Sequence, residues 1–188
     1  MAKLTLLETA AAAQLLRDGQ VIAYPTEAVY GLGCDPANES AVRKLLALKG
    51  RHETAGLVLI ASEYSQIRPW VADIDEALID KPMQTWPGPV TWLFPRAGGV
   101  PDYVAGSHKT IAVRITAHEP SRLLCQASGS ALISTSANPS SASPARSAEE
   151  VDTYFGQGIA GILAGPLGGA EKPSEIRDLV SENIIRQG

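Results

Sequence analysis

Short apolar runs alternate with helical segments along this chain, and this alternation constrains its fold more than any other feature. Runs rich in β-branched residues, typical of buried strands, cover Val21–Tyr24, Leu57–Ala61, Val90–Phe94, Thr110–Ile115 and Ala131–Thr135. Shorter strands are predicted near Ile162, over Ile176–Val180 and over Ile184–Arg186. Strands that alternate with helices indicate an α/β fold, and the short returns near Pro95 and Gly165 favour a mixed sheet.

Helical patterns fill the intervals between these runs. They cover Thr9–Arg17, a segment from Asn38 or Ser40 to Lys49, Asp73–Trp86, Ser121–Ser128 and a segment from Ser147 to Phe155. Ser147 with Glu150 predicts a capping box at the last helix. The chain shows no internal repeat and no linker long enough to divide it. We therefore predict a single α/β domain over residues 1–188, an open twisted mixed β-sheet with flanking helices.

The stretch 21–35 (VIAYPTEAVYGLGCD) is the first candidate for a functional site. Its predicted strand ends at Pro25, because proline cannot continue a central ladder. A hydroxyl, a carboxylate and two glycines follow: Thr26, Glu27, Gly31 and Gly33. Open α/β sheets build sites at the exits of buried strands, and glycine lets the backbone approach a ligand closely. The alternative is an ordinary loop with turn glycines.

The composition is that of a soluble globular protein, with 45% hydrophobic and 19% charged residues. The net charge of −4 argues against coating nucleic acid through bulk charge, but it is compatible with a local basic groove. Cys34 and Cys125 lie far apart and form no CxxC motif, which predicts free thiols in a reducing compartment. The sequence shows neither a signal peptide nor an apolar run of membrane-spanning length, so we expect a cytoplasmic protein with no membrane partner.

Several familiar site motifs are missing. The segment Gly168–Ser174 fails the spacing of a Walker A loop, and a dinucleotide fingerprint from Gly31 would need glycine where Pro36 stands. His52-Glu53 lacks the second histidine of a zincin, and no GxSxG nucleophile elbow is present. With three histidines in the chain, the sequence does not support a histidine-rich metal site, and we predict no metal held by the protein.

What remains is a set of cations and small polar side chains at the ends of predicted elements. Lys49 and Arg51 flank a glycine at a helix end. There they either complement the helix dipole or clamp a phosphate with a point charge and a bidentate fork. Ser136 and Asn138 lie two apart on an extended segment and so face the same side, either as turn residues or as ligand contacts.

Arg114 stands on a strand that the pattern predicts to be buried. A buried arginine needs an anionic partner, which is either a structural Asp or Glu or a bound anion. Ser174 and Arg186 are uninformative on their own.

Taken together, six segments resemble the YrdC/TsaC family of threonylcarbamoyl-AMP synthases. They are Tyr24–Asp35 (YPTEAVYGLGCD), Leu48–Arg51 (LKGR), Trp86–Thr91 (WPGPVT), Ile111–Arg114 (IAVR), Ser134–Asn138 (STSAN) and Pro173–Asp178 (PSEIRD). They follow the family's order and cover nearly the whole chain, which is far more specific than one motif. The length resembles the short, single-domain form of the family.

The resemblance implies a role for each matching residue. The family's paired signature, K-x-R with S-x-N, falls on Lys49, Arg51, Ser136 and Asn138. It implies that these four line the ATP site and act in catalysis, with Arg186 reaching the nucleotide from the C-terminus. It also implies that the threonine substrate is held by Thr26, Arg114, Ser134 and Ser174.

The chain departs from the family pattern at three places. His52 stands where a proline usually follows the K-x-R arginine, and Ala55 replaces a common basic residue. Ser140-Ser141 replaces the glycine that usually follows the S-A-N segment. These departures leave the conformations of residues 52–56 and 139–146 open.

The implied reaction joins L-threonine, bicarbonate and ATP into threonylcarbamoyl-adenylate and releases pyrophosphate. The product feeds modification of the adenosine beside the anticodon of tRNA through downstream tRNA threonylcarbamoyl-transferase proteins. The nucleophile is a carbamate oxygen made from threonine's amine and bicarbonate, so no catalytic Cys or His is needed. Mg²⁺ is expected on the ATP phosphates rather than in a protein cage.

Two other functions stay open. Arg43, Lys44, Lys49 and Arg51 could present a cationic patch to folded RNA in a non-catalytic RNA-binding module that uses the same cleft. Weak tRNA binding could also accompany catalysis, although an aromatic content of 5% offers few stacking platforms. A carbamoyl-transfer or maturation module is the third function, because related domains occur inside larger maturation proteins.

Overall fold

The computed structural model describes residues 5–188. The strands are β1 Leu6–Leu7, β2 Ile22–Pro25, β3 Tyr30–Gly33, β4 Val58–Ala61, β5 Val90–Pro95, β6 Thr110–Ile115, β7 Leu132–Ser136, β8 Ile162–Leu163, β9 Glu175–Asp178 and β10 Ile184–Arg186. The α-helices are α1 Thr9–Arg17, α2 Glu39–Lys49, α3 Tyr64–Ile67, α4 Glu76–Met83, α5 Asp102–Ala105, α6 Glu119–Ser128 and α7 Ala148–Phe155. Short 3-10 turns cover Glu53–Ala55, Arg68–Trp70 and Gly156–Gly158. The predictions for α1 and β6 match to the residue, α4 is shorter than predicted, and β1, β3 and α5 have no counterpart among the predictions.

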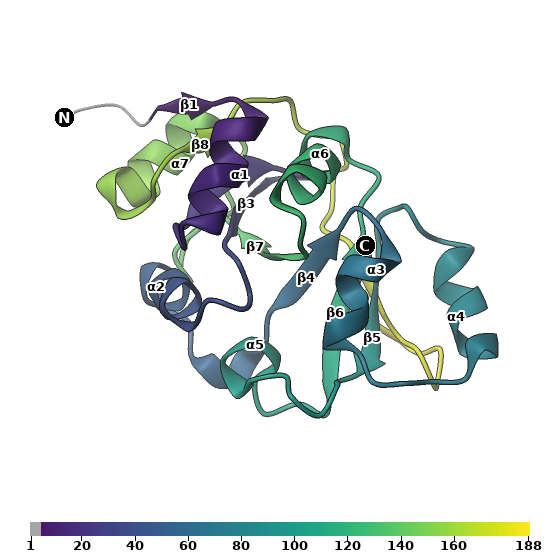
Figure 1. The fold of residues 1–188 in the computed structure, drawn as a ribbon. Helices are drawn as coiled ribbons and strands as arrows, with labels where there is room; N and C mark the ends of the chain where they lie inside the picture. The colour runs from purple at the N-terminus through teal and green to yellow at the C-terminus, as the bar shows by residue number, and fades with distance from the viewer. Residues whose placement is uncertain (1–4) are drawn as a thin grey trace.

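The described residues form one ten-stranded mixed sheet with helices on both faces (Figure 1). The strands follow the order β1-β8-β2-β3-β7-β4-β6-β5-β9-β10. Strand β4 shows the mixed character, since it pairs parallel with β6 and antiparallel with β7. The predicted fold class, an open mixed β-sheet with flanking helices, is confirmed.

The candidate stretch 21–35 forms an antiparallel hairpin of β2 and β3. Pro25 is the last residue of β2, opposite Tyr30, so the predicted end of the strand is confirmed. Gly31 and Gly33 are not turn glycines, because both belong to β3. A Cβ on Gly33 would lie 2.5 Å from Cε1 of the fully buried Tyr24. The glycine therefore lets the strand pass over a tyrosine ring, which no larger residue would permit.

The residues that begin and end the helices are largely those predicted. Asn38 caps α2 by accepting a backbone hydrogen bond at 3.0 Å, and Gly50 ends that helix with a left-handed φ of 59°. Ser147 caps α7 by accepting from Glu150 N at 3.2 Å. The reciprocal half of the predicted capping box is wrong, because the Glu150 carboxylate accepts from Arg146 N at 2.7 Å instead of from Ser147 N.

The sheet has a hydrophobic core on each face. On one face, α1 and α6 lie side by side (Figure 1) and bury Leu16 and Leu124 against Ile60 and Leu132. On the other face, residues of α2, α5 and α7 pack with apolar side chains from the central strands. The second face holds the larger of the two cores. On the first face, α1 and α6 leave part of the sheet uncovered.

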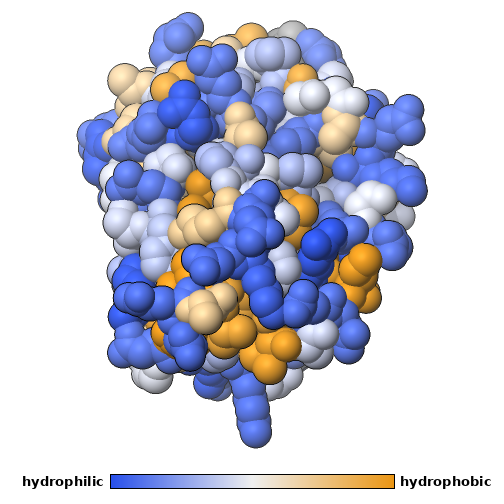
Figure 2. Space-filling model, turned by 90° about the vertical axis from the view of Figure 1, so that its right-hand side faces the viewer, coloured by the Kyte–Doolittle hydropathy of each residue, from blue (hydrophilic) through white to orange (hydrophobic). Residues whose placement is uncertain are grey.

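The side of the molecule that carries α4 and the β9–β10 hairpin mixes hydrophilic and hydrophobic surface (Figure 2). The exposed apolar side chains of these elements and their neighbouring turns are Met83, Val180, Ile184 and Ile185. An ion pair between Lys81 and Glu182 joins α4 to the hairpin. Within residues 5–188, no helix has both the length and the apolar character needed to span a membrane.

Candidate active site

Strand register gathers small and polar side chains on one face of the sheet. Val58 on β4 pairs with Ser134 on β7 and with Ala112 on β6, so these three side chains share a face. Two residues along, the same face carries Ile60 and Leu132, which α1 and α6 cover. Beyond the two helices the small side chains leave room above the sheet.

A cavity of about 480 Å³ occupies that uncovered region. Its wall contains seven of the nine residues that the sequence predicts for the site: Thr26, Arg51, Arg114, Ser134, Ser136, Ser174 and Arg186. Lys49 and Asn138 lie outside the lining and support it from behind. The fold thus brings together segments from the beginning, middle and end of the chain.

Lys49, the last residue of α2, is only 4% exposed. Its Nζ donates to the backbone oxygen of Ser136 at 2.5 Å and of Asn138 at 2.8 Å. Burial, together with the nearby charge of Arg51, lowers the pKa of Lys49 to about 8. The two halves of the K-x-R and S-x-N signature therefore meet through a direct contact, with the lysine bound to the backbone of the second half.

Ser136 and Asn138 face the same side, as predicted. Ser136 Oγ donates to Asn138 Oδ1 at 2.6 Å, and Asn138 Nδ2 donates to two carbonyl oxygens of the following loop at 3.0 and 2.7 Å. Ser140, where the family usually has glycine, donates from Oγ to Lys49 O at 2.7 Å. This bond satisfies a carbonyl at the end of α2 that has no partner inside the helix. The loop 139–146, whose conformation was open because the chain departs from the family pattern there, is thus attached to α2.

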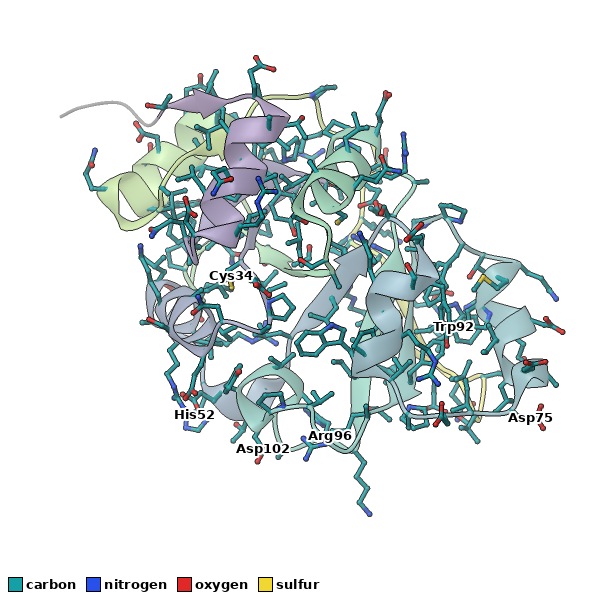
Figure 3. The ribbon with its side chains drawn as sticks, in the orientation of Figure 1. Cys34, His52, Asp75, Trp92, Arg96 and Asp102 are labelled. Atoms are coloured by element: carbon teal, nitrogen blue, oxygen red, sulfur yellow. The ribbon has the colours of Figure 1, made fainter. Side chains whose placement is uncertain are left out.

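Arg51, two residues after Lys49, lines the cavity itself. Its Nη2 donates to Gly56 O at 2.7 Å, and burial lowers its pKa. His52, where the family usually has proline, caps the next turn by accepting from Thr54 N at 3.3 Å. A second hollow opens on the outside of this turn, between His52 and Asp102, which both lie at this end of the molecule (Figure 3).

Arg114 has a structural anion as its partner. Its Nη2 lies 3.2 Å from Glu27 Oε2, and the two side chains are 8% and 16% exposed. The alternative of a structural carboxylate is confirmed, although Arg114 also lines the cavity. In the part of the chain that is described, Arg114 Nε is buried without a hydrogen-bond partner. The sequence showed Glu27 beside Thr26, but nothing in the spacing could pair it with so distant a strand.

Ser174 and Arg186 belong to the C-terminal side of the cavity. Arg186 Nη2 donates to Ser174 O at 2.6 Å, and Ser174 Oγ lies 3.0 Å from Thr91 Oγ1. Burial, together with the charge of Arg114, lowers the pKa of Arg186. Two arginines from separate strands therefore face the same cavity, which suits a ligand with more than one negative group.

The loop before β9 closes the cavity beside the β2–β3 turn. Gly168 N donates to Thr26 O at 3.0 Å, and Ala170 N donates to Glu27 O at 2.9 Å. These bonds bring Lys172 to the cavity wall as a further exposed cation. The sequence analysis missed Lys172, because this glycine-rich segment was visible only as a failed phosphate loop.

Comparison with known proteins gives the chain a family and solved relatives. A family profile of Sua5/YciO/YrdC proteins, described as telomere recombination, matches residues 14–188. The threonylcarbamoyl-AMP synthase of Halorhodospira halophila (strain DSM 244 / SL1) is 52% identical over 176 residues, which are 94% of this chain and 92% of the relative.

Two solved structures show the same fold. The crystal structure of P. abyssi Sua5 complexed with L-threonine aligns with a TM-score of 0.84 and 32% identity, over 90% of this chain and 50% of that one. This chain therefore spans about half the length of the P. abyssi protein. E. coli YciO aligns with a TM-score of 0.79 at 24% identity, over 96% of this chain and 88% of that one, which is a likeness of fold.

Proposed function

This chain belongs to the Sua5/YciO/YrdC family, and from that membership we propose that it is a threonylcarbamoyl-AMP synthase. The proposed reaction joins L-threonine, bicarbonate and ATP into L-threonylcarbamoyl-adenylate and releases pyrophosphate. One structural observation carries the proposal: a single cavity joins Arg51, Ser136 and Arg186 to Thr26 and Arg114. The cavity is large enough for a small amino acid beside a phosphate chain and is lined by cations and hydroxyl groups.

We propose that the ATP phosphates lie at the Arg51 end. Adenylyl transfer depends on positioning and charge neutralisation, and a guanidinium offers two parallel donors to phosphate oxygens. Lys49 would hold the segment of Ser136 and Asn138 in place and add positive potential from behind the wall. Arg186 would approach the nucleotide from the opposite side.

We propose that threonine binds at the Arg114 end. The guanidinium of Arg114 has five N–H donors, of which one nitrogen faces Glu27, so further donors remain for the substrate carboxylate. Thr26, Ser134 and Ser174 place hydroxyl groups on the same wall for the polar atoms of threonine. The P. abyssi relative was solved in complex with L-threonine, which supports this choice of substrate.

The proposed chemistry needs no nucleophile from the protein. The neutral amine of threonine attacks the carbon of bicarbonate, and water leaves to give the carbamate. A carbamate oxygen then attacks the α-phosphorus, and pyrophosphate leaves with the electron pair of the broken P–O bond. Cys34 and Cys125 are consistent with this scheme, because both are buried outside the cavity lining and burial raises the pKa of each thiol to about 12. Cys34 lies inside the fold beside α2 (Figure 3).

Mg²⁺ would enter with ATP and supply charge neutralisation on the phosphates. Among residues 5–188, no three His, Cys, Asp or Glu side chains cluster as a metal site.

We propose that the product passes, in the cytoplasm, to tRNA threonylcarbamoyl-transferase proteins that modify the adenosine next to the anticodon. Direct tRNA binding by the patch around Arg43 has weaker support, because Arg43 pairs with Glu39 and Glu53.

The decisive experiment detects the adenylate by mass spectrometry after incubation of the protein with ATP, threonine and bicarbonate. Serine serves as a competing amino acid. Arg68→Ala is the matched control for arginine variants of the site, since Arg68 is exposed, pairs with Asp73 and does not line the cavity. Absence of the adenylate from reactions with the wild-type protein would overturn the proposal.

A further inference from the structure

Glu27 occupies an unusual position for a carboxylate, because both of its oxygens have specific partners at the edge of the cavity. Oε2 lies 3.2 Å from Arg114 Nη2, and Oε1 accepts from Thr116 Oγ1 at 2.7 Å. The Glu27 side chain is 16% exposed. A carboxylate with a specific partner on each oxygen is held in one orientation by the protein.

Thr116 holds Glu27 in one orientation. Thr116 is fully buried, and its backbone N donates to Ala61 O at 3.0 Å, so its own position is fixed by β4. Its Oγ1 accepts from His118 N at 3.1 Å, which leaves the hydroxyl hydrogen for Glu27. The direction of the bond is thereby set, with Thr116 as donor and Glu27 as acceptor.

Arg114 needs such an anchor. Within the described chain Glu27 is its ion-pair partner, while the like charge of Arg186 acts across the cavity. Without Glu27, the guanidinium would face a second cation with no carboxylate to offset it. It would then be expected to leave the position in which its remaining donors face the cavity.

We propose that Glu27 is the positioning residue of the amino-acid site, and that it acts on the substrate only through Arg114. Its carboxylate holds one side of the guanidinium, so the rest of the fork is presented to the carboxylate of an α-amino acid. Thr116 fixes Glu27 in turn. This inference rests on the proposed function, because it assigns Arg114 to the carboxylate of threonine.

The test is a double-mutant cycle with kcat/KM for threonine as the readout. This quantity is obtained from initial slopes at low threonine even where KM is very high. Glu27→Gln in the wild-type background should lower kcat/KM for threonine by about 10-fold or more through KM, with kcat and the KM for ATP changed by less than about 2-fold. In an Arg114→Met background, the same Glu27→Gln change should alter kcat/KM for threonine by less than about 2-fold, because no guanidinium remains to be positioned.

Thr116 supplies a second pair of variants in case Glu27→Gln folds poorly. Thr116→Val removes the hydroxyl that fixes Glu27 and should lower kcat/KM for threonine by about 3-fold or more, whereas Thr116→Ser keeps the hydroxyl and should behave like the wild type. Thermal melting of all variants separates these effects from loss of fold.

Two results would overturn the inference. An equal loss in the wild-type and Arg114→Met backgrounds would show that Glu27 acts without Arg114, and a parallel rise in the KM for ATP would show a general structural role. Calorimetric titration with threonine repeats the cycle without turnover. If the wild type binds threonine but forms no adenylate, the proposed function fails. The calorimetric cycle would then still test whether Glu27 positions Arg114 for threonine binding. If adenylate forms and the cycle shows no coupling, the positioning role alone fails.

Discussion

Raising the pH through 8 should weaken ATP binding, because it removes the charge of Lys49. Lys49 is 4% exposed and its pKa is lowered from 10.5 to about 8. At pH 9 only about one molecule in eleven would then carry the ammonium. If ATP binds the charged form alone, its apparent Kd at pH 9 should be about ten-fold higher than at pH 7. A lysine with its ordinary pKa would remain charged over this range and leave the Kd unchanged.

The same pKa shift predicts the opposite trend for stability. The pKa of Lys49 is lower in the folded protein than the value of 10.5 for the free side chain. The unfolded chain therefore binds more protons than the folded protein between the two pKa values. The Lys49 contribution to the free energy of unfolding then rises with pH over that window, by about 3 kcal/mol at most. A loss of ATP affinity at pH 9 would thus occur without a matching loss of fold.

Calorimetric titration with ATP from pH 7 to pH 9.5 measures the first trend, and urea denaturation at the same pH values measures the second. Lys49→Arg is the matched control, because a guanidinium keeps its charge throughout this range and its ATP Kd should stay flat. A flat Kd in the wild type, or an equal rise in Lys49→Arg, would refute the reasoning.

Three further variants test other parts of the site and the fold. Arg51→Ala should reduce adenylate formation by about 100-fold or more, the scale for removing one preorganised charge donor, as measured by pyrophosphate release; a wild-type rate would contradict its role. Thr26→Val should weaken threonine binding by about 1 kcal/mol while leaving ATP binding unchanged, since it removes one hydroxyl, and calorimetry that shows equal losses for both ligands would count against this. Gly33→Ala should lower the free energy of unfolding by about 2 kcal/mol or more, because its Cβ would lie 2.5 Å from Tyr24 Cε1 and 2.6 Å from Ile133 O. Urea denaturation measures that loss, and an unchanged midpoint would show that the strand can move aside.

Hydrophobic periodicity predicted the elements that are buried and regular. The pattern of β6 matches to the residue, because both of its neighbours in the sheet are strands and its larger apolar side chains, Ile111, Val113 and Ile115, are buried. The failure at β3 has a physical cause: two of its four residues are glycines, which carry no hydrophobic signal. Gly33 is there because the ring of Tyr24 occupies the space where its side chain would lie. A tertiary contact therefore decided a local structure that the local sequence could not predict.

The candidate site shows the same difference between what the local sequence predicts and what only the fold decides. The resemblance to the family marked Lys49, Arg51, Ser136 and Asn138 as a set, and the fold brings their segments into contact. The sequence contained no information about which member of the set faces the cavity. Lys49 is turned toward backbone carbonyls and Arg51 toward the open space, because the left-handed Gly50 between them redirects the chain by the end of α2. The roles of these four residues in ATP binding and catalysis stay predictions.

Charge distribution explains how an acidic protein can offer a site for anions. The chain carries a net charge of −4, yet Arg51, Arg114, Lys172 and Arg186 all line one cavity. Among its lining residues Glu27 is the single carboxylate side chain, and it is committed to Arg114 and Thr116. Mutual repulsion of the cations is therefore only partly offset within the protein, and an anionic ligand would relieve the rest. Salt that screens exposed charges should affect Lys172 more than the buried Arg114. Added salt should therefore slow ligand binding mainly through Lys172, whereas the affinity of the bound ligand should depend mainly on Arg114.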